Sequence, residues 1–155
     1  LSRLKYGYPD KYITVSRAIK EILVSDGISP EKVAAVYSGV DLGNYKNIKS
    51  DYLLGEFSTI PGIGKKVRLV NVAALTAQKD HETLIRAAGI IKRQFKDFIL
   101  FIAGNGELED GLVNLCSRMG LEDYIKFTGF RSDALNLIGF ADIFVMSSRL
   151  EGLGT

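Results

Sequence analysis

Short apolar runs alternate with amphipathic stretches through the second part of the chain. Residues 67–73, 98–103 and 143–146 form largely apolar runs bounded by turn residues, and residues 125–128 form a weaker one. Such runs are typical of strands that are buried on both faces of a parallel sheet. We therefore predict four strands in this part of the chain.

Apolar residues at three- and four-residue spacing predict a helix after each of the first three strands. These stripes lie within residues 84–95, 108–119 and 135–140. Asp80 is a suitable N-cap for the first helix, and Gly120 is a suitable C′ residue for the second. Strict alternation of strand and helix predicts an α/β fold with a Rossmann-like, doubly wound parallel sheet.

The first part of the chain repeats this pattern in shorter form. Strand candidates at residues 13–15 and 33–37 flank a helical stripe at 17–25, and a polar, glycine-rich stretch follows. We interpret residues 1–40 as the end of a preceding α/β domain, 41–64 as an inter-domain connection and 65–155 as a partial second domain. The chain opens without Met and stops in an apparent loop, so we expect a piece of a longer protein.

Charge and composition exclude several classes of protein. The chain has 155 residues, with 20 Lys and Arg against 18 Asp and Glu, and no strongly basic half, which argues against a nucleic-acid partner. One Cys and one His cannot form an internal disulfide or a four-ligand zinc site. No signal segment and no window of about 18 apolar residues is present, so we expect a cytoplasmic protein. The basic, Tyr-containing first twenty residues suit either peripheral contact with the inner face of a membrane or an ordinary surface.

Candidate chemistry lies in the segments that follow the predicted strands, because open parallel sheets bind ligands beyond the carboxyl ends of their strands. These segments are residues 73–81, 104–108, 129–131 and 151–155, and three of the four contain glycine. Backbone N–H groups and helix N-termini in such loops favour an anion. Together with a Lys and a Glu, they indicate a site for a phosphorylated, sugar-like ligand.

The ordered motifs of these loops resemble a known family. They are Val-x-x-Leu-x-x-x-Lys-Asp-His at 72–81, Ile-Ala-Gly-Asn-Gly-Glu-Leu at 102–108, Phe-Thr-Gly-Phe at 127–130 and Ala-Asp-Ile-Phe-Val-x-x-Ser-x-x-Glu-Gly-Leu-Gly at 141–154. This set resembles the C-terminal, nucleotide-sugar-binding domain of retaining GT-B glycosyltransferases of the GT4 type, the glycosyl transferases group 1. Val-Ser-Arg-Ala at 15–18 and Ser-Gly-Val-Asp at 38–41 resemble the passage out of the family's N-terminal, acceptor-side domain. The resemblance covers about residues 13–155.

The resemblance implies roles for individual residues. Lys79 matches a lysine that neutralises the donor diphosphate as the glycosyl bond breaks, with a solvated loop Lys as the alternative. Glu151 matches the first carboxylate of a Glu-x7-Glu motif near the donor sugar, with a loop carboxylate or helix cap as the alternative. The second carboxylate would fall four residues beyond Thr155. Further donor contacts are expected from Gly104, Asn105, Gly106, Phe130, Arg131, Gly152, Leu153, Gly154 and Thr155.

Several of these residues also have a purely structural interpretation. The glycines at 104 and 106 can serve a tight strand-to-helix turn, and Phe130 and Arg131 can be ordinary loop packing. His81 is more simply a first-turn helix residue than a base, and Cys116 a core residue. The family usually has an Arg on the diphosphate where this chain has Ala74, so Arg149 or Arg131 compensates, or Lys79 and backbone amides act alone.

We therefore expect a hexosyltransferase of polysaccharide biosynthesis. It would move a sugar from a UDP- or GDP-linked donor to a carbohydrate or lipid-linked acceptor with retention, without metal or cofactor, and the 155 residues alone would be inactive. Two alternatives stay open. A non-catalytic nucleotide-binding module is compatible with Ala74. A dinucleotide-dependent oxidoreductase is less favoured, because Glu109 stands where the third Gly of Gly-x-Gly-x-x-Gly belongs.

Overall fold

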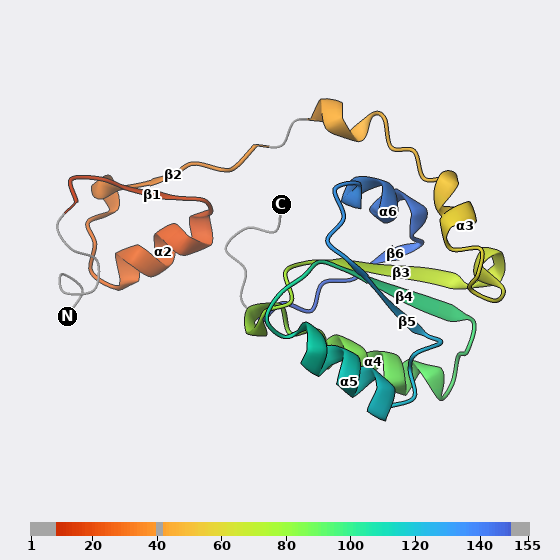
Figure 1. The fold of residues 1–155 in the computed structure, drawn as a ribbon. Coiled ribbons are helices and arrows are strands. Elements are labelled where there is room, and N and C mark those ends of the chain that lie inside the picture. Colours follow the sequence, from red (N-terminus) through yellow and green to blue (C-terminus); the bar gives the residue numbers. More distant parts are fainter. Residues whose placement is uncertain (1–8, 40–41, 150–155) are drawn as a thin grey trace. The chain divides into compact units, whose positions relative to one another are not determined.

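The computed structural model describes residues 9–39 and 42–149, with the backbone alone at positions 42 and 44. Internal contacts divide the described chain into two compact units, the first ending at Leu42 and the second beginning at Gly43. Each unit is built from α/β elements, and each is described by itself (Figure 1).

The first unit is a small strand–helix–strand arrangement. Strand β1 (Tyr12–Thr14) pairs in parallel with β2 (Val33–Ala35), and helix α2 (Arg17–Ser25) connects them. The Ser16 hydroxyl caps the helix by accepting a hydrogen bond of 3.2 Å from the Ile19 N–H. No residue of α2 is buried, so this unit has little core of its own among the described residues.

The second unit contains a parallel sheet of four strands. Their order across the sheet is β5–β4–β3–β6 (Figure 1). The strands are β3 (Val67–Val72), β4 (Phe98–Ala103), β5 (Ile125–Gly129) and β6 (Ile143–Phe144). The α-helices of this unit are α3 (Tyr52–Glu56), α4 (His81–Lys92), α5 (Glu109–Arg118) and α6 (Ala134–Phe140). The predicted Rossmann-like α/β fold is confirmed.

Helices cover both faces of this sheet, and the central strand β4 is buried along its whole length (Figure 1). Leu100 and Ile102 pack with α4 and α5 on one face, whereas Ile99 and Phe101 pack with α3 and α6 on the other. Successive side chains of a strand point to opposite faces, so an uninterrupted apolar run fits a strand that is covered on both sides.

The stretch that precedes β3 contributes to the core of the second unit. Leu53, Ile60 and Ile63 are buried against the same sheet face as α6. The ring of Phe57 lies 4.5 Å from that of Phe101, measured between centroids. Residues 41–64 are expected from the sequence to form an inter-domain connection; in the structure the residues from Gly43 onward belong to the second unit.

Some local features that the sequence predicts for the second unit are present, and one differs. Asp80 caps α4, Gly120 adopts a positive φ of 62° after α5, and Cys116 is buried. The run at 143–146 differs from expectation, because β6 covers only two residues that are both exposed. Among the described strands β6 pairs with β3 alone, so it lacks the second neighbour that would bury it. Within the described residues, the helices are all too short or too polar to cross a membrane.

Candidate functional site

A cavity of about 330 Å³ opens where strands β3, β4 and β5 end. Its lining comes from the last residues of β3 and β4, from the three loops that follow these strands and from the start of α6. It brings together four residues that the sequence analysis singled out: Gly104, Asn105, Phe130 and Arg131. Ala74 also lines it. This is the edge of a parallel sheet at which ligands usually bind.

The glycines of the loop after β4 allow two backbones to meet. Gly104 has a φ of +141°, and a Cβ atom there would collide with the carbonyl of Ala73. A Cβ atom on Gly106 would lie 2.5–2.8 Å from backbone atoms of Leu75. The Leu75 N–H donates to the Asn105 carbonyl at 2.9 Å, which joins the two loops directly. Packing between loops therefore accounts for glycine at both positions, and it builds one wall of the cavity.

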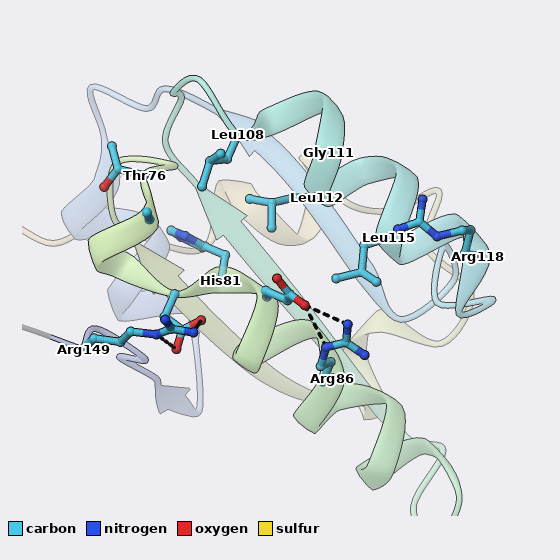
Figure 2. A pocket seen from close by; sticks show the side chains of 12 residues that line it. Thr76, His81, Arg86, Leu108, Gly111, Leu112, Leu115, Arg118 and Arg149 are labelled. Carbon is cyan, nitrogen blue, oxygen red and sulfur yellow. Dashed lines mark hydrogen bonds and ion pairs between the residues drawn. The ribbon is translucent and has the colours of Figure 1, made fainter.

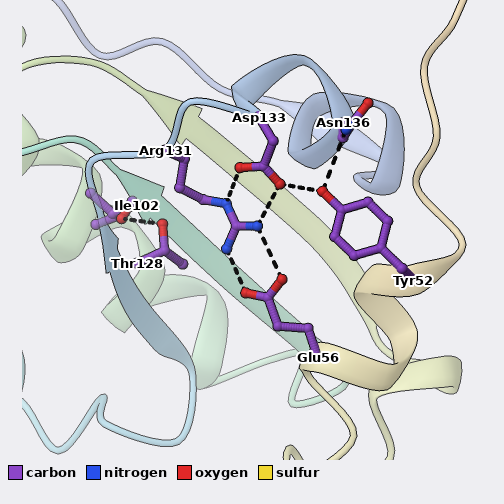
Figure 3. A network of polar contacts seen from close by, with 7 residues as sticks. All are labelled: Tyr52, Glu56, Ile102, Thr128, Arg131, Asp133 and Asn136. Atoms are coloured by element: carbon purple, nitrogen blue, oxygen red, sulfur yellow. Dashed lines mark hydrogen bonds and ion pairs between the residues drawn. The ribbon is translucent and has the colours of Figure 1, made fainter.

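The loop after β5 contributes Phe130 and Arg131 to the lining, and their side chains differ in exposure and contacts. Phe130 is 75% exposed, whereas the Arg131 side chain is 13% exposed and bound to two carboxylates (Figure 3). Arg131 donates to Asp133 at 2.7 and 2.8 Å and to Glu56 at 2.5 and 3.0 Å. Hydrogen bonds from Arg131, and then from Tyr52, lower the pKa of Asp133 to about 2. Arg131 is thus already neutralised and is a poor replacement for a phosphate-binding Arg at position 74.

Lys79 lies on a short 3₁₀ turn (Ala77–Lys79) between β3 and α4, at the same edge of the sheet. Its side chain is half-buried and is not part of the cavity lining. The Ser147 hydroxyl donates to the Lys79 carbonyl at 2.8 Å and so joins this turn to the segment after β6. Glu151, Gly152, Leu153, Gly154 and Thr155 lie outside the described residues.

Arg149 lies against the Lys79 turn rather than the cavity. Its guanidinium donates to Asp80 at 2.7 Å, and its backbone N–H donates to the Gln78 carbonyl at 2.9 Å. Arg149, and then Thr83, lower the pKa of Asp80 by hydrogen bonding to its carboxylate. Asp80 has a left-handed φ of 49°, which is uncommon outside glycine.

A buried pair of polar side chains was missed by the sequence analysis. Asn71 of β3 donates through Nδ2 to the Val145 carbonyl at 2.8 Å, and its Oδ1 lies 2.9 Å from Nε2 of His81. Because Oδ1 can only accept, Nε2 carries the ring proton. Burial lowers the pKa of His81, so the ring is neutral at pH 7. A polar residue inside an apolar strand was the available signal, and the pair supports the structural interpretation of His81.

A second cavity, of about 340 Å³, lies between α4 and α5 (Figure 2). It is lined by apolar residues such as Leu112 and by Arg86, which donates to Glu82 at 2.7 Å. Of the residues considered for donor binding, Arg149 lines it, whereas Lys79, Gly104, Asn105, Phe130 and Arg131 do not. The cavity at the carboxyl ends of the strands is therefore the better candidate site.

Comparison with known proteins identifies the class. A model of the family described as glycosyl transferases group 1 matches residues 56–155, so the chain belongs to this family. An uncharacterized glycosyltransferase from Methanocaldococcus jannaschii, MJ1607, is 33% identical over 92% of this chain and 37% of its own length. The N-acetylgalactosamine-N,N'-diacetylbacillosaminyl-diphospho-undecaprenol 4-alpha-N-acetylgalactosaminyltransferase of Campylobacter jejuni is 29% identical over 98% of this chain and 39% of its own length.

The fold has close counterparts among solved structures. Anabaena Alr3699/HepE in complex with UDP and glucose superimposes with a TM-score of 0.80 at 22% identity, over 99% of this chain and 42% of that protein. The domain is thus a GT-B type α/β domain. The chain spans less than two fifths of the length of the two curated relatives named above.

Proposed function

We propose that this chain carries most of the donor-binding part of a retaining, GT4-type hexosyltransferase. The observation that carries the proposal is the cavity at the carboxyl ends of β3, β4 and β5, lined by Asn105 and Phe130, in a member of the glycosyl transferases group 1. Its lining is mostly apolar, with Ala73, Ala74 and Phe130 among the residues, and it suits a nucleobase and ribose. The donor is a UDP- or GDP-linked sugar.

The chemical step breaks the bond between the anomeric carbon of the sugar and the diphosphate. Negative charge then collects on the leaving diphosphate, and the Lys79 ammonium and loop amides stabilise it, without a metal ion. Glu151 orients the donor sugar, and Gly152, Leu153, Gly154 and Thr155 offer backbone amides to the donor. The acceptor oxygen bonds to the anomeric carbon on the same face of the sugar and its proton passes to the leaving diphosphate, so the anomeric configuration is retained.

The acceptor is a carbohydrate or a lipid-linked carbohydrate, as in polysaccharide biosynthesis. The name of the Campylobacter jejuni relative, a transferase acting on a diphospho-undecaprenol-linked sugar, supports a lipid-linked acceptor. Such an acceptor places the full-length protein at the inner face of the membrane, and the basic first twenty residues suit peripheral contact there. Most of the acceptor site lies outside the 155 residues, so this chain alone should transfer no sugar.

The deciding experiment uses the full-length protein. UDP and GDP are compared by their shift of the melting temperature, and the corresponding nucleotide sugars are then tested for transfer to lipid-linked acceptors. Lys79→Ala should lower kcat by about 10²–10³-fold without loss of folding, because it removes charge stabilisation from the leaving group. Lys96→Ala, an exposed lysine before β4 at the opposite edge of the sheet, should leave kcat unchanged. Equal activity of both variants would contradict the role of Lys79.

A nucleotide-binding module without catalysis is the second candidate. It is favoured by Ala74 in the cavity and by the full engagement of Arg131, which leave no Arg fork for a diphosphate among the described cavity residues. Calorimetry that detects UDP or GDP binding, combined with no transfer from any matching nucleotide sugar, would support this function over the transferase.

A further inference from the structure

We infer that Arg131 is a positioning residue: its guanidinium fastens the loop after β5, one wall of the candidate donor cavity, to helix α3. In this assignment the side chain shapes the cavity and does not itself bind the donor phosphates. For its binding consequence the inference rests on the proposed function.

The hydrogen bonds of Arg131 leave little capacity for a ligand. A guanidinium has five N–H donors, and four hydrogen bonds from Arg131 go to the carboxylates of Asp133 and Glu56. Both contacts are bidentate, which is the geometry that an Arg would otherwise offer to a phosphate. With the side chain 13% exposed, a phosphate could bind there only by displacing a carboxylate.

The charge of the cluster points the same way. One guanidinium faces two carboxylates, so the group of Arg131, Glu56 and Asp133 carries a surplus negative charge. Arg131 and Tyr52 hold the pKa of Asp133 at about 2, which keeps this carboxylate ionised at neutral pH. A diphosphate would be repelled by the surplus charge rather than attracted to it.

The network extends from Arg131 into the segment that precedes β3 (Figure 3). The Tyr52 hydroxyl donates to Asp133 and lies 3.4 Å from Nδ2 of Asn136, in α6. The Asn136 side chain also accepts a hydrogen bond of 3.0 Å from the backbone N–H of Lys49. The side chains of Arg131, Asp133 and Asn136 therefore form hydrogen bonds with residues 49–56, which lie far away in sequence.

The loop itself has few other anchors close to the cavity. Phe130 is 75% exposed, so it contributes little packing that could hold the wall in place. Phe130, Arg131 and Ala134 all line the cavity, and of these only Arg131 forms ion pairs. Beside the Tyr52–Asp133 hydrogen bond and the bond from the Gly104 N–H to the Gly129 carbonyl, the wall is held by Arg131, whose partner outside the loop is Glu56.

Glu56→Gln in the full-length protein separates positioning from direct binding. A positioning Arg131 loses its anchor in this variant, so nucleotide binding weakens, whereas a phosphate-binding Arg131 is freed from a competing carboxylate, so binding is unchanged or tighter. If Arg131 positions the wall, removing the charge of Glu56 should weaken UDP or GDP binding by about three- to tenfold. Arg131→Gln should weaken it to a similar extent, and the double variant should be no weaker than the poorer single variant. Unchanged or tighter binding by Glu56→Gln, with weaker binding by Arg131→Gln, would overturn the inference in favour of a direct phosphate contact.

Hydrogen exchange tests the same inference without any nucleotide. The amides of Asn136 and Leu137 donate to the Asp133 carbonyl of this loop at 2.8 and 3.2 Å. In Glu56→Gln these two amides should exchange about tenfold faster than in the wild type, while those of β4 keep their protection. Unchanged exchange of these two amides would overturn the inference, even if the wild type binds neither UDP nor GDP and the proposed function itself fails. Glu82→Gln is the matched control, since Glu82 also binds a single Arg, Arg86, but lies away from the donor cavity.

Discussion

Several single side chains of this protein form hydrogen bonds between segments that are far apart in sequence. Asn71 is the clearest case, because its amide is buried in β3 and bonds both the Val145 carbonyl and the ring of His81. A buried polar group lowers stability unless it is hydrogen-bonded, so the native fold is favoured over any packing in which Asn71 lacks these two partners. The second ring nitrogen of His81 has no hydrogen-bond partner in the described structure.

The free energy of unfolding should therefore fall with acidification through the titration of His81. The folded pKa of His81 lies below 6.5 because burial of the ring lowers it. The charge of Asp80 raises this pKa and that of Lys79 lowers it, and the effect of burial is the largest of the three. Below pH 6.5 the unfolded chain binds the proton first, so stability should drop by about 1 kcal/mol per pH unit down to the folded pKa.

Urea unfolding between pH 7.5 and 5.5 measures this slope, and His81→Gln should flatten it. Asp133 does not interfere in this range. Its folded pKa of about 2 lies below its ordinary value of 3.8, so its contribution is fully present above about pH 4 and is lost only as pH falls toward 2. Identical slopes in the wild type and His81→Gln would contradict the assignment of a buried, neutral ring.

At the scale of elements, helix α3 shows how a short segment gains its structure from its neighbours. Five residues are too few for a helix that is stable by itself in water. Leu53 is fully buried against the sheet face that α6 also covers, and Glu56 pairs with Arg131. Packing and one ion pair thus hold the helix, and they place its polar side next to the donor cavity.

Leu53→Ala should lower the free energy of unfolding by about 2–5 kcal/mol, because it leaves a cavity in a core that is otherwise filled. Leu54→Ala is the matched control, since the neighbouring leucine is 44% exposed and its truncation should cost less than about 0.5 kcal/mol. Urea unfolding of both variants gives the comparison. Similar losses in the two variants would show that α3 is not packed as described.

At the scale of the whole molecule, stability is concentrated in the second unit. Both apolar clusters of the described core lie between residues 53 and 145. In the first unit, the buried described residues are Thr14, Ile28 and Val33. Since apolar burial is the main stabilising contribution, the two units should differ strongly in resistance to opening.

Hydrogen exchange on the 155-residue chain should show this difference directly. Amides of β4 should be the slowest to exchange, and amides of β1, α2 and β2 should exchange within the shortest labelling times. Peptide-level mass spectrometry is sufficient, because within the described residues the two units adjoin in sequence at residues 42–43 alone. Comparable protection in both units would mean that the first unit is stabilised by contacts not seen in its described residues.

The sequence by itself determined the class of fold and most of its elements. The apolar runs predicted β3, β4 and β5, and the helical stripes predicted α4, α5 and α6, since the periods of side-chain orientation are local properties of strands and helices. The motif order located the loops after the strands, and four of the residues singled out there line one cavity.

Only the tertiary structure decided what the side chains in those loops touch. Glu56 is 75 residues away from Arg131 in sequence, and Asn71 reaches Val145 at a separation of 74. The same holds for the glycines, whose small size is required by the neighbouring loop after β3. Spacing along the chain specifies which face a residue occupies, but its partner across space depends on how strands and helices are placed together, which no local pattern contains.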